Sequence, residues 1–254
     1  MGKEGVCHIC GKYGPLSFEH VPPKSAFYKT SLIELSAEDA LLLGPDDVAK
    51  GRHIQRMGGY TLCGRCNNIT GQWYGAAFAH FCYQGMELLL KSDGKGSLHY
   101  PFMIYPLRVF KQIVTMFFSI NAPGFGRGDE LVKFVLNKNW RWLSGKYRFY
   151  MYLCEGPRFR KIGNVVKGEL FSTRMAYLSE LSYYPFGFLM TDSTTIPDQR
   201  LFPINHFKDY QYDDLRQIFL KPVKLETHMV LPADYRTKKE LKTDFERNTG
   251  LLKE

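Results

Sequence analysis

Two cysteine pairs place the tightest constraint on what this chain can fold into. Cys7 and Cys10 are separated by two residues, and so are Cys63 and Cys66. Four thiolates at this spacing form a closed tetrahedral zinc site when the two pairs meet in space. The 52 residues between the pairs exceed the usual gap of such sites, but tripling a flexible loop costs only about 1 kcal/mol of closure entropy. We therefore predict one structural zinc held by all four cysteines.

The remaining composition indicates a protein of the reducing cytoplasm. The sequence contains no uncharged apolar run long enough for a membrane span, so we expect no membrane partner. The first residues lead into Cys7 without an apolar segment, unlike a signal peptide. In a chain without a secretion signal, paired cysteines are metal ligands rather than disulfide partners. Cys82 and Cys154 lie in apolar stretches, and we expect them to be buried thiols without a special role.

The net charge of +9 is unevenly distributed along the chain. Residues 1–100 carry 10 Lys and Arg against 9 Asp and Glu, whereas residues 101–254 carry 24 against 16. A basic excess away from the cysteines is typical of a surface for a polyanion such as nucleic acid. A soluble protein that is merely basic has the same composition, so charge alone does not decide between the two.

The order of patterns predicts an α+β fold in two parts. Residues 16–21 alternate like a short strand, residues 52–62 form a second strand interrupted by Gly58 and Gly59, and the pattern after Cys66 is helical, with a break near Gly85 as one option. Residues 1–95 would form a zinc-stapled module of two strands and a helix. A Gly-rich linker at residues 91–97 leads to a strand-rich domain over residues 100–254, which begins with a helix over residues 107–120. This second part is the candidate for recognition of substrate, of a protein partner or of another copy of the chain.

The residues beside the cysteines resemble a known family. Glu19-His20 is followed by Val-Pro-Pro at the end of the first predicted strand, and Asn67 directly follows Cys66. With the two cysteine pairs, this arrangement resembles the HNH, or His-metal finger, endonucleases. It is most similar to the branch whose ββα-metal motif is pinned by a four-cysteine zinc, as in phage junction resolvases. The resemblance covers residues 7 to about 75.

The resemblance implies a role for each of these residues. His20 would be the general base that deprotonates water, a task suited to an imidazole at neutral pH. Glu19 and Asn67 would hold one hard divalent cation, Mg2+ or Mn2+, which stabilises charge as the phosphodiester breaks. The zinc would be structural only, because a closed four-thiolate site has no open position for substrate.

The chain departs from the family at one position. The family's middle Asn, which orients the base histidine, lies a few residues before the second cysteine pair, yet residues 21–62 contain no Asn. His53, Gln55 or a backbone carbonyl could orient His20 in place of that Asn.

Further candidates for contact with substrate are basic or polar. Residues 140–152 alternate around a Ser-Gly turn signal, which predicts a β-hairpin that interleaves Arg141, Lys146 and Arg148 with aromatic residues. An ordinary half-buried sheet alternates in the same way, and we expect sheet structure first and nucleic-acid contact second. Arg65 and Asn68, near the second cysteine pair, are candidates for phosphate contact.

Three functions remain open from the sequence. The leading expectation is a metal-dependent HNH-type endonuclease that hydrolyses nucleic acid, DNA in the first place, and family analogy places such enzymes in phage defence or mobile elements. The second is a non-catalytic zinc module that binds nucleic acid or protein. The third is an RNA-cleaving effector that uses the same residues.

Overall fold

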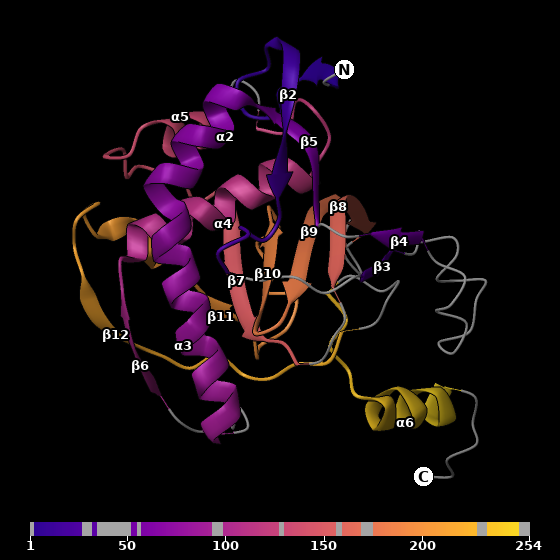
Figure 1. The fold of residues 1–254 in the computed structure, drawn as a ribbon. Coiled ribbons are helices and arrows are strands. Elements are labelled where there is room, and N and C mark those ends of the chain that lie inside the picture. The colour runs from indigo at the N-terminus through magenta and orange to yellow at the C-terminus, as the bar shows by residue number, and fades with distance from the viewer. Residues whose placement is uncertain are drawn as a thin grey trace.

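The computed structural model describes residues 3–26, 32–34, 52–54, 57–92, 99–126, 130–155, 159–168, 175–227 and 233–248. Helices and strands are mixed throughout, which confirms the predicted α+β class (Figure 1).

The N-terminal part contains a three-stranded antiparallel sheet followed by a helix. The sheet has the order β1-β2-β5, formed by β1 (Glu4–Val6), β2 (Tyr13–His20) and β5 (Gly58–Cys63). Helix α2 (Gly64–Thr70) begins directly after β5. The predicted second strand is divided, because residues 52–54 belong to a separate pair of short strands, β3 (Leu32–Glu34) and β4 (Arg52–Ile54). Two long strands and the helix after them thus follow the predicted order.

The helical stretch after Cys66 is irregular at a place other than the predicted one. A π-helical turn, η2 (Gly71–Gly75), joins α2 to α3 (Ala76–Ser92), and Gly85 lies inside α3 without breaking it. A Cβ atom at Gly85 would lie 2.3 Å from the ring of Phe186. The glycine therefore permits close packing of a strand against the helix.

The C-terminal part is built around helix α4 and a five-stranded antiparallel sheet. The sheet order is β11-β7-β10-β9-β8, with strands β7 (Arg148–Leu153), β8 (Arg160–Gly168), β9 (Met175–Tyr183), β10 (Phe186–Thr191) and β11 (Phe202–Pro203). The other elements are β6 (Tyr100–Ile104) paired with β12 (Arg216–Leu220), α4 (Pro106–Ile120), α5 (Glu130–Leu136), the 3-10 turn η3 (Asn205–Asp209) and α6 (Lys238–Asn248).

The predicted hairpin over residues 140–152 is wrong. Residues 140–147 form no strand, and β7 pairs with β10 and β11. The carbonyl groups of Trp140 and Leu143 instead accept hydrogen bonds from the side chains of Lys111 and Lys208. Because these lysines bond the carbonyls that a strand partner would need, this segment runs outside the sheet.

Helix α4 is the centre of the molecule. Thirteen of its 15 residues are buried, and it lies between the N-terminal sheet and the five-stranded sheet, in contact with β5, β8 and β9 (Figure 1). One hydrophobic core includes Cys7 and Cys66 together with Phe117 and with Phe149 of β7. The described residues of the segments 1–95 and 100–254 thus share one core. The division of the chain into two domains stays a prediction. The predicted linker lies largely outside the described residues.

Candidate functional site

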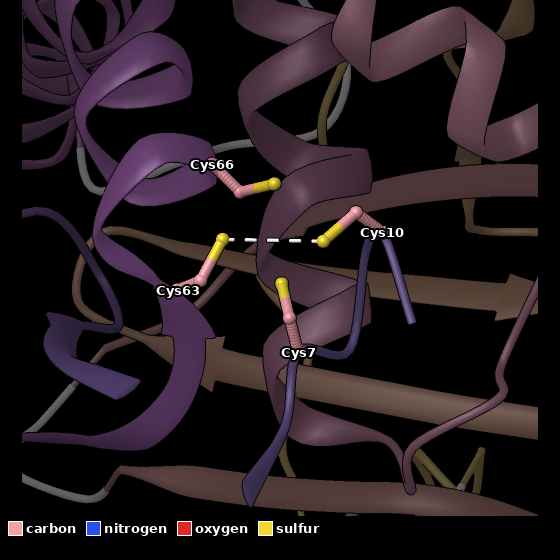
Figure 2. A group of neighbouring side chains, drawn as sticks. All are labelled: Cys7, Cys10, Cys63 and Cys66. Carbon is pink, nitrogen blue, oxygen red and sulfur yellow. Dashed lines mark hydrogen bonds between the residues drawn. The ribbon is translucent and has the colours of Figure 1, made fainter. Parts of the chain in front are cut away.

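The four cysteines of the two pairs converge on one point. Their Sγ atoms all lie within 4.8 Å of one another, and those of Cys10 and Cys63 are 3.9 Å apart (Figure 2). A tetrahedral ion with zinc–sulfur bonds of about 2.3 Å requires sulfurs about 3.8 Å apart, whereas a disulfide requires about 2.0 Å. All four thiols are free of disulfides. The spacing and the donor chemistry therefore fit a zinc ion.

Backbone pairing brings the two cysteine pairs together. Cys7 and Cys10 lie in the turn between β1 and β2, where Gly11 (φ 71°) takes a left-handed conformation and donates to the Cys7 carbonyl at 2.8 Å. The backbone N–H of His8 donates to the Thr61 carbonyl at 2.9 Å, which joins this turn to β5. The other pair is placed by the junction of β5 and α2. Antiparallel pairing of β2 with β5 thus closes the 52-residue gap.

Hydrogen bonding between the thiols shifts their pKa values in opposite directions. A hydrogen bond from the Cys66 thiol, helped by backbone N–H groups, lowers the pKa of Cys7 to about 4 against the opposing effect of burial. The pKa of Cys66 is raised for the matching reason, since its proton is held by Cys7. A cluster that stabilises a thiolate before any ion binds is suited to a thiophilic cation.

Glu19 lies at the end of β2 and is 4% exposed. Its carboxylate accepts hydrogen bonds from the hydroxyl of Ser119 on α4 and from Thr61 Oγ1 at 3.4 Å. Burial raises the pKa of Glu19 to about 8, although both hydroxyl groups act to lower it. The pair partner of Glu19 in β5 is Gly59, and Gly58 (φ 141°) packs against the Glu19 carbonyl. A Cβ atom at Gly58 would lie 1.8 Å from the Glu19 carbonyl oxygen, so this glycine lets the second predicted strand run close beside Glu19.

Asn67 lies beside the same strand. Its Nδ2 donates to Ser17 Oγ at 3.0 Å and to the Phe18 carbonyl at 3.2 Å. Both bonds use the amide nitrogen, so Oδ1 is the atom of this side chain that could hold a cation. Asn67 is thus brought to the residues that directly precede Glu19 and His20.

His20 is half-buried and lies on an aromatic surface. Its ring meets that of Phe18 edge-on at 5.1 Å between centroids, and Phe18 meets Tyr60 at 5.4 Å. Glu19, His20 and Asn67 therefore lie on neighbouring segments, each with its own contacts. For the missing middle Asn, the His53 side chain and Gln55 lie outside the described residues.

The predicted substrate-contacting residues are spread over the surface. Arg65 and Asn68 are exposed on α2. Arg141 donates to the Asp209 carbonyl at 3.0 Å, Arg148 donates to the Thr194 carbonyl, and the Lys146 amino group lies 4.8 Å from the ring centroid of Tyr147. Contact with nucleic acid stays a prediction for all five.

Sequence reasoning missed the residues that support the site from α4. Ser119 follows Glu19 by 100 residues, and the side chain of His8 contacts the Phe118 carbonyl through Nδ1 at 3.0 Å. His8 is half-buried and lies against α4. No local pattern points to these contacts, because they depend on how α4 packs.

Comparison with protein-family models, with curated proteins and with solved structures found no match. In the part of the chain that the structure describes, no helix is long and apolar enough to cross a membrane.

Proposed function

We propose that this protein is a metal-dependent endonuclease of the HNH type that hydrolyses phosphodiester bonds in nucleic acid. The observation that carries the proposal is the position of Asn67. It follows the last cysteine of a cluster with metal-binding geometry, and it contacts the strand that ends in Glu19-His20. A zinc ion in the cluster would fix the first turn of α2 against β2. The acid, the imidazole and the amide are then held by rigid elements rather than by loops.

The chain's own residues supply distinct parts of the proposed reaction. His20 would take the proton from the attacking water, for which a half-buried imidazole with access to solvent is suited. The oxygens of Glu19 and Asn67 would hold Mg2+ or Mn2+, and such a cation supplies charge stabilisation at the scissile phosphate. The four cysteines would hold a zinc ion away from the reaction, because their closed set leaves no ligand position for substrate.

Nucleic acid is the substrate class that the charge distribution favours. The net charge of residues 101–254 is +8 (24 Lys and Arg against 16 Asp and Glu), and Arg65 and Asn68 are exposed on the helix that carries Asn67. We propose DNA as the first substrate, RNA as the second, and a cytoplasmic role in defence against phage or in a mobile element by family analogy alone.

A non-catalytic zinc module is the second candidate. The burial of the Glu19 carboxylate against Ser119 and Thr61 favours it, since this acid is not presented to solvent. In that case the cysteine cluster would stabilise a surface that binds nucleic acid or protein, and no second cation would bind.

A cleavage assay separates the two candidates. Zinc-loaded protein would be incubated with supercoiled plasmid, with duplex and single-stranded DNA oligonucleotides and with RNA, in Mg2+, Mn2+ or EDTA. We expect cleavage in Mg2+ or Mn2+, none in EDTA, and none from His20→Ala. His99→Ala, which changes an exposed histidine outside the site, is the matched control and should cleave like the wild type. Absence of cleavage of every substrate with either cation would support the binding module instead.

A further inference from the structure

The last turn of α4 contacts the zinc module at two consecutive residues. The carbonyl of Phe118 faces His8 Nδ1 at 3.0 Å, inside the first cysteine pair. The hydroxyl of Ser119 donates to Glu19 Oε2, and both of these side chains are buried. One turn of one helix thus contacts both the cysteine cluster and the candidate metal-binding acid.

The single proton of the Ser119 hydroxyl has two acceptors within reach. One is Glu19 Oε2, and the other is the Thr115 carbonyl one turn earlier at 3.5 Å. The bond to Glu19 is the shorter of the two, so it is the bond that the hydroxyl proton makes. Thr61 donates to the same carboxylate oxygen at 3.4 Å. The carboxylate is therefore held between a hydroxyl of α4 and a hydroxyl of β5, with Ser119 as the closer donor.

Hydrogen bonds of Asn121 fix the end of α4 that carries Ser119. Asn121, directly after α4, donates through Nδ2 to the Phe117 carbonyl at 2.8 Å. Its Oδ1 accepts from the Asn164 backbone at 2.6 Å and from Ser179 Oγ at 2.9 Å, which ties the end of α4 to β8 and β9. The Ser119 hydroxyl therefore belongs to a rigid junction of α4 with both sheets, so it can impose an orientation on Glu19.

From this geometry we propose that Ser119 is a positioning residue for Glu19, orienting its carboxylate for the divalent cation of the proposed function. The inference rests on the proposed function, and it extends the site beyond the segment that resembles the nuclease family. The metal ligands that Glu19 and Asn67 would supply are oxygens, the ligand type that Mg2+ and Mn2+ prefer. Loss of a hydrogen-bond partner of a metal ligand typically weakens metal binding by about 10- to 100-fold.

The test measures Mn2+ binding to zinc-loaded protein without nucleic acid. Isothermal titration would compare the wild type with Ser119→Ala and with the isosteric pair Ser119→Thr and Ser119→Val, which differ from each other only in the hydroxyl. We expect Mn2+ to bind about 10- to 100-fold more weakly to the Ala variant than to the wild type, and to the Val variant than to the Thr variant. Zinc content should stay unchanged in all. Thr115→Val is the matched control, because that buried hydroxyl donates to the Lys111 carbonyl of its own helix, and its Mn2+ affinity should equal that of the wild type.

The outcomes separate the two proposals. Equal Mn2+ affinity in the Thr and Val variants, with a wild type that binds Mn2+ and cleaves, would overturn the role of Ser119 and leave the endonuclease proposal standing. A wild type that neither binds Mn2+ beyond its zinc nor cleaves nucleic acid would overturn both. The Thr and Val pair keeps the test valid if the Ala variant fails to fold, since both members introduce the same shape.

Discussion

Replacement of Cys66 by alanine should remove the metal cross-link between the two halves of the cysteine cluster. Cys66 is buried, and its Sγ lies within 4.8 Å of the other three. The cross-link joins Cys10 to Cys63 across 53 positions. Closing a loop of that length costs about 4 kcal/mol of chain entropy, and the ion offsets that cost only in the folded state, because the unfolded chain releases it. In a chain of this size each kcal/mol shifts the melting temperature by about 2–4 °C. We therefore expect Cys66→Ala to melt about 8–16 °C below the wild type.

The assay is thermal unfolding with and without a zinc chelator, combined with metal analysis of the purified protein. Cys82→Ala is the matched control, because Cys82 is also a buried thiol on a helix and lies outside the cluster. It should lose on the order of 1 kcal/mol, as for removal of a buried methyl group, and keep its zinc. The chelator should lower the melting temperature of the wild type and of Cys82→Ala but leave that of Cys66→Ala unchanged. A wild type purified without zinc, with a melting temperature insensitive to zinc or chelator, would refute the reasoning.

Three further predictions concern packing and charge in the core. Burial lowers the pKa of Lys111 from 10.5 to about 7, so the unfolded chain binds more protons between these values and stability rises with pH. Relative to Lys111→Met, the wild type should gain roughly 2 kcal/mol in free energy of unfolding between pH 7 and pH 9 in urea titrations; a constant difference would contradict the shift. Glu180→Leu leaves the buried Arg160 guanidinium without its carboxylate partner. Urea denaturation should show that the free energy of unfolding falls by about 3–5 kcal/mol, and an unchanged denaturation midpoint would contradict this prediction. Gly85→Ala should destabilise despite its better helix propensity, because the new methyl group meets the ring of Phe186 at 2.3 Å; a raised denaturation midpoint would show that the ring moves at no cost.

Periodicity and cysteine spacing predicted much of the architecture. The apolar spacing of residues 107–120 gave α4 to within one residue, and the C-x2-C spacing gave the cluster that the structure assembles. Both signals are local or depend on chemistry that only a few folds satisfy. The strand predicted over residues 140–147 is wrong because contacts distant in the sequence decide its structure. Its alternation satisfies the strand pattern, but the side chains of Lys111 and Lys208 bond the carbonyls of Trp140 and Leu143.

One missed element did carry a readable signal. The polar composition of residues 235–241 does not indicate a helix, yet α6 begins at Lys238. The Thr237 hydroxyl accepts from the Glu240 backbone at 3.2 Å, and the Glu240 carboxylate accepts from the Thr237 backbone at 2.5 Å. This is a capping box, recognisable in the sequence as Thr-x-x-Glu. The lack of apolar residues concealed it.

The orientation of Glu19 lay beyond any reading of the sequence. The strand pattern places Glu19 next to His20, but it does not show which side of the sheet meets α4. That depends on the irregular pairing of β2 with β5 between Ser17 and Phe18 and on Ser119, 100 residues away. The cysteine cluster was therefore predictable in its residue types and its position, whereas the contacts of Glu19 with α4 were not.

Chemical rescue of His20→Ala tests the central claim most directly. The measurement is the initial rate of Mg2+-dependent plasmid nicking by this variant, with and without added imidazole. Nicking that is absent without imidazole and partly restored with it would establish the imidazole of His20 as the proton acceptor. A variant that nicks at the wild-type rate without imidazole would contradict the assignment of this site as the nuclease centre.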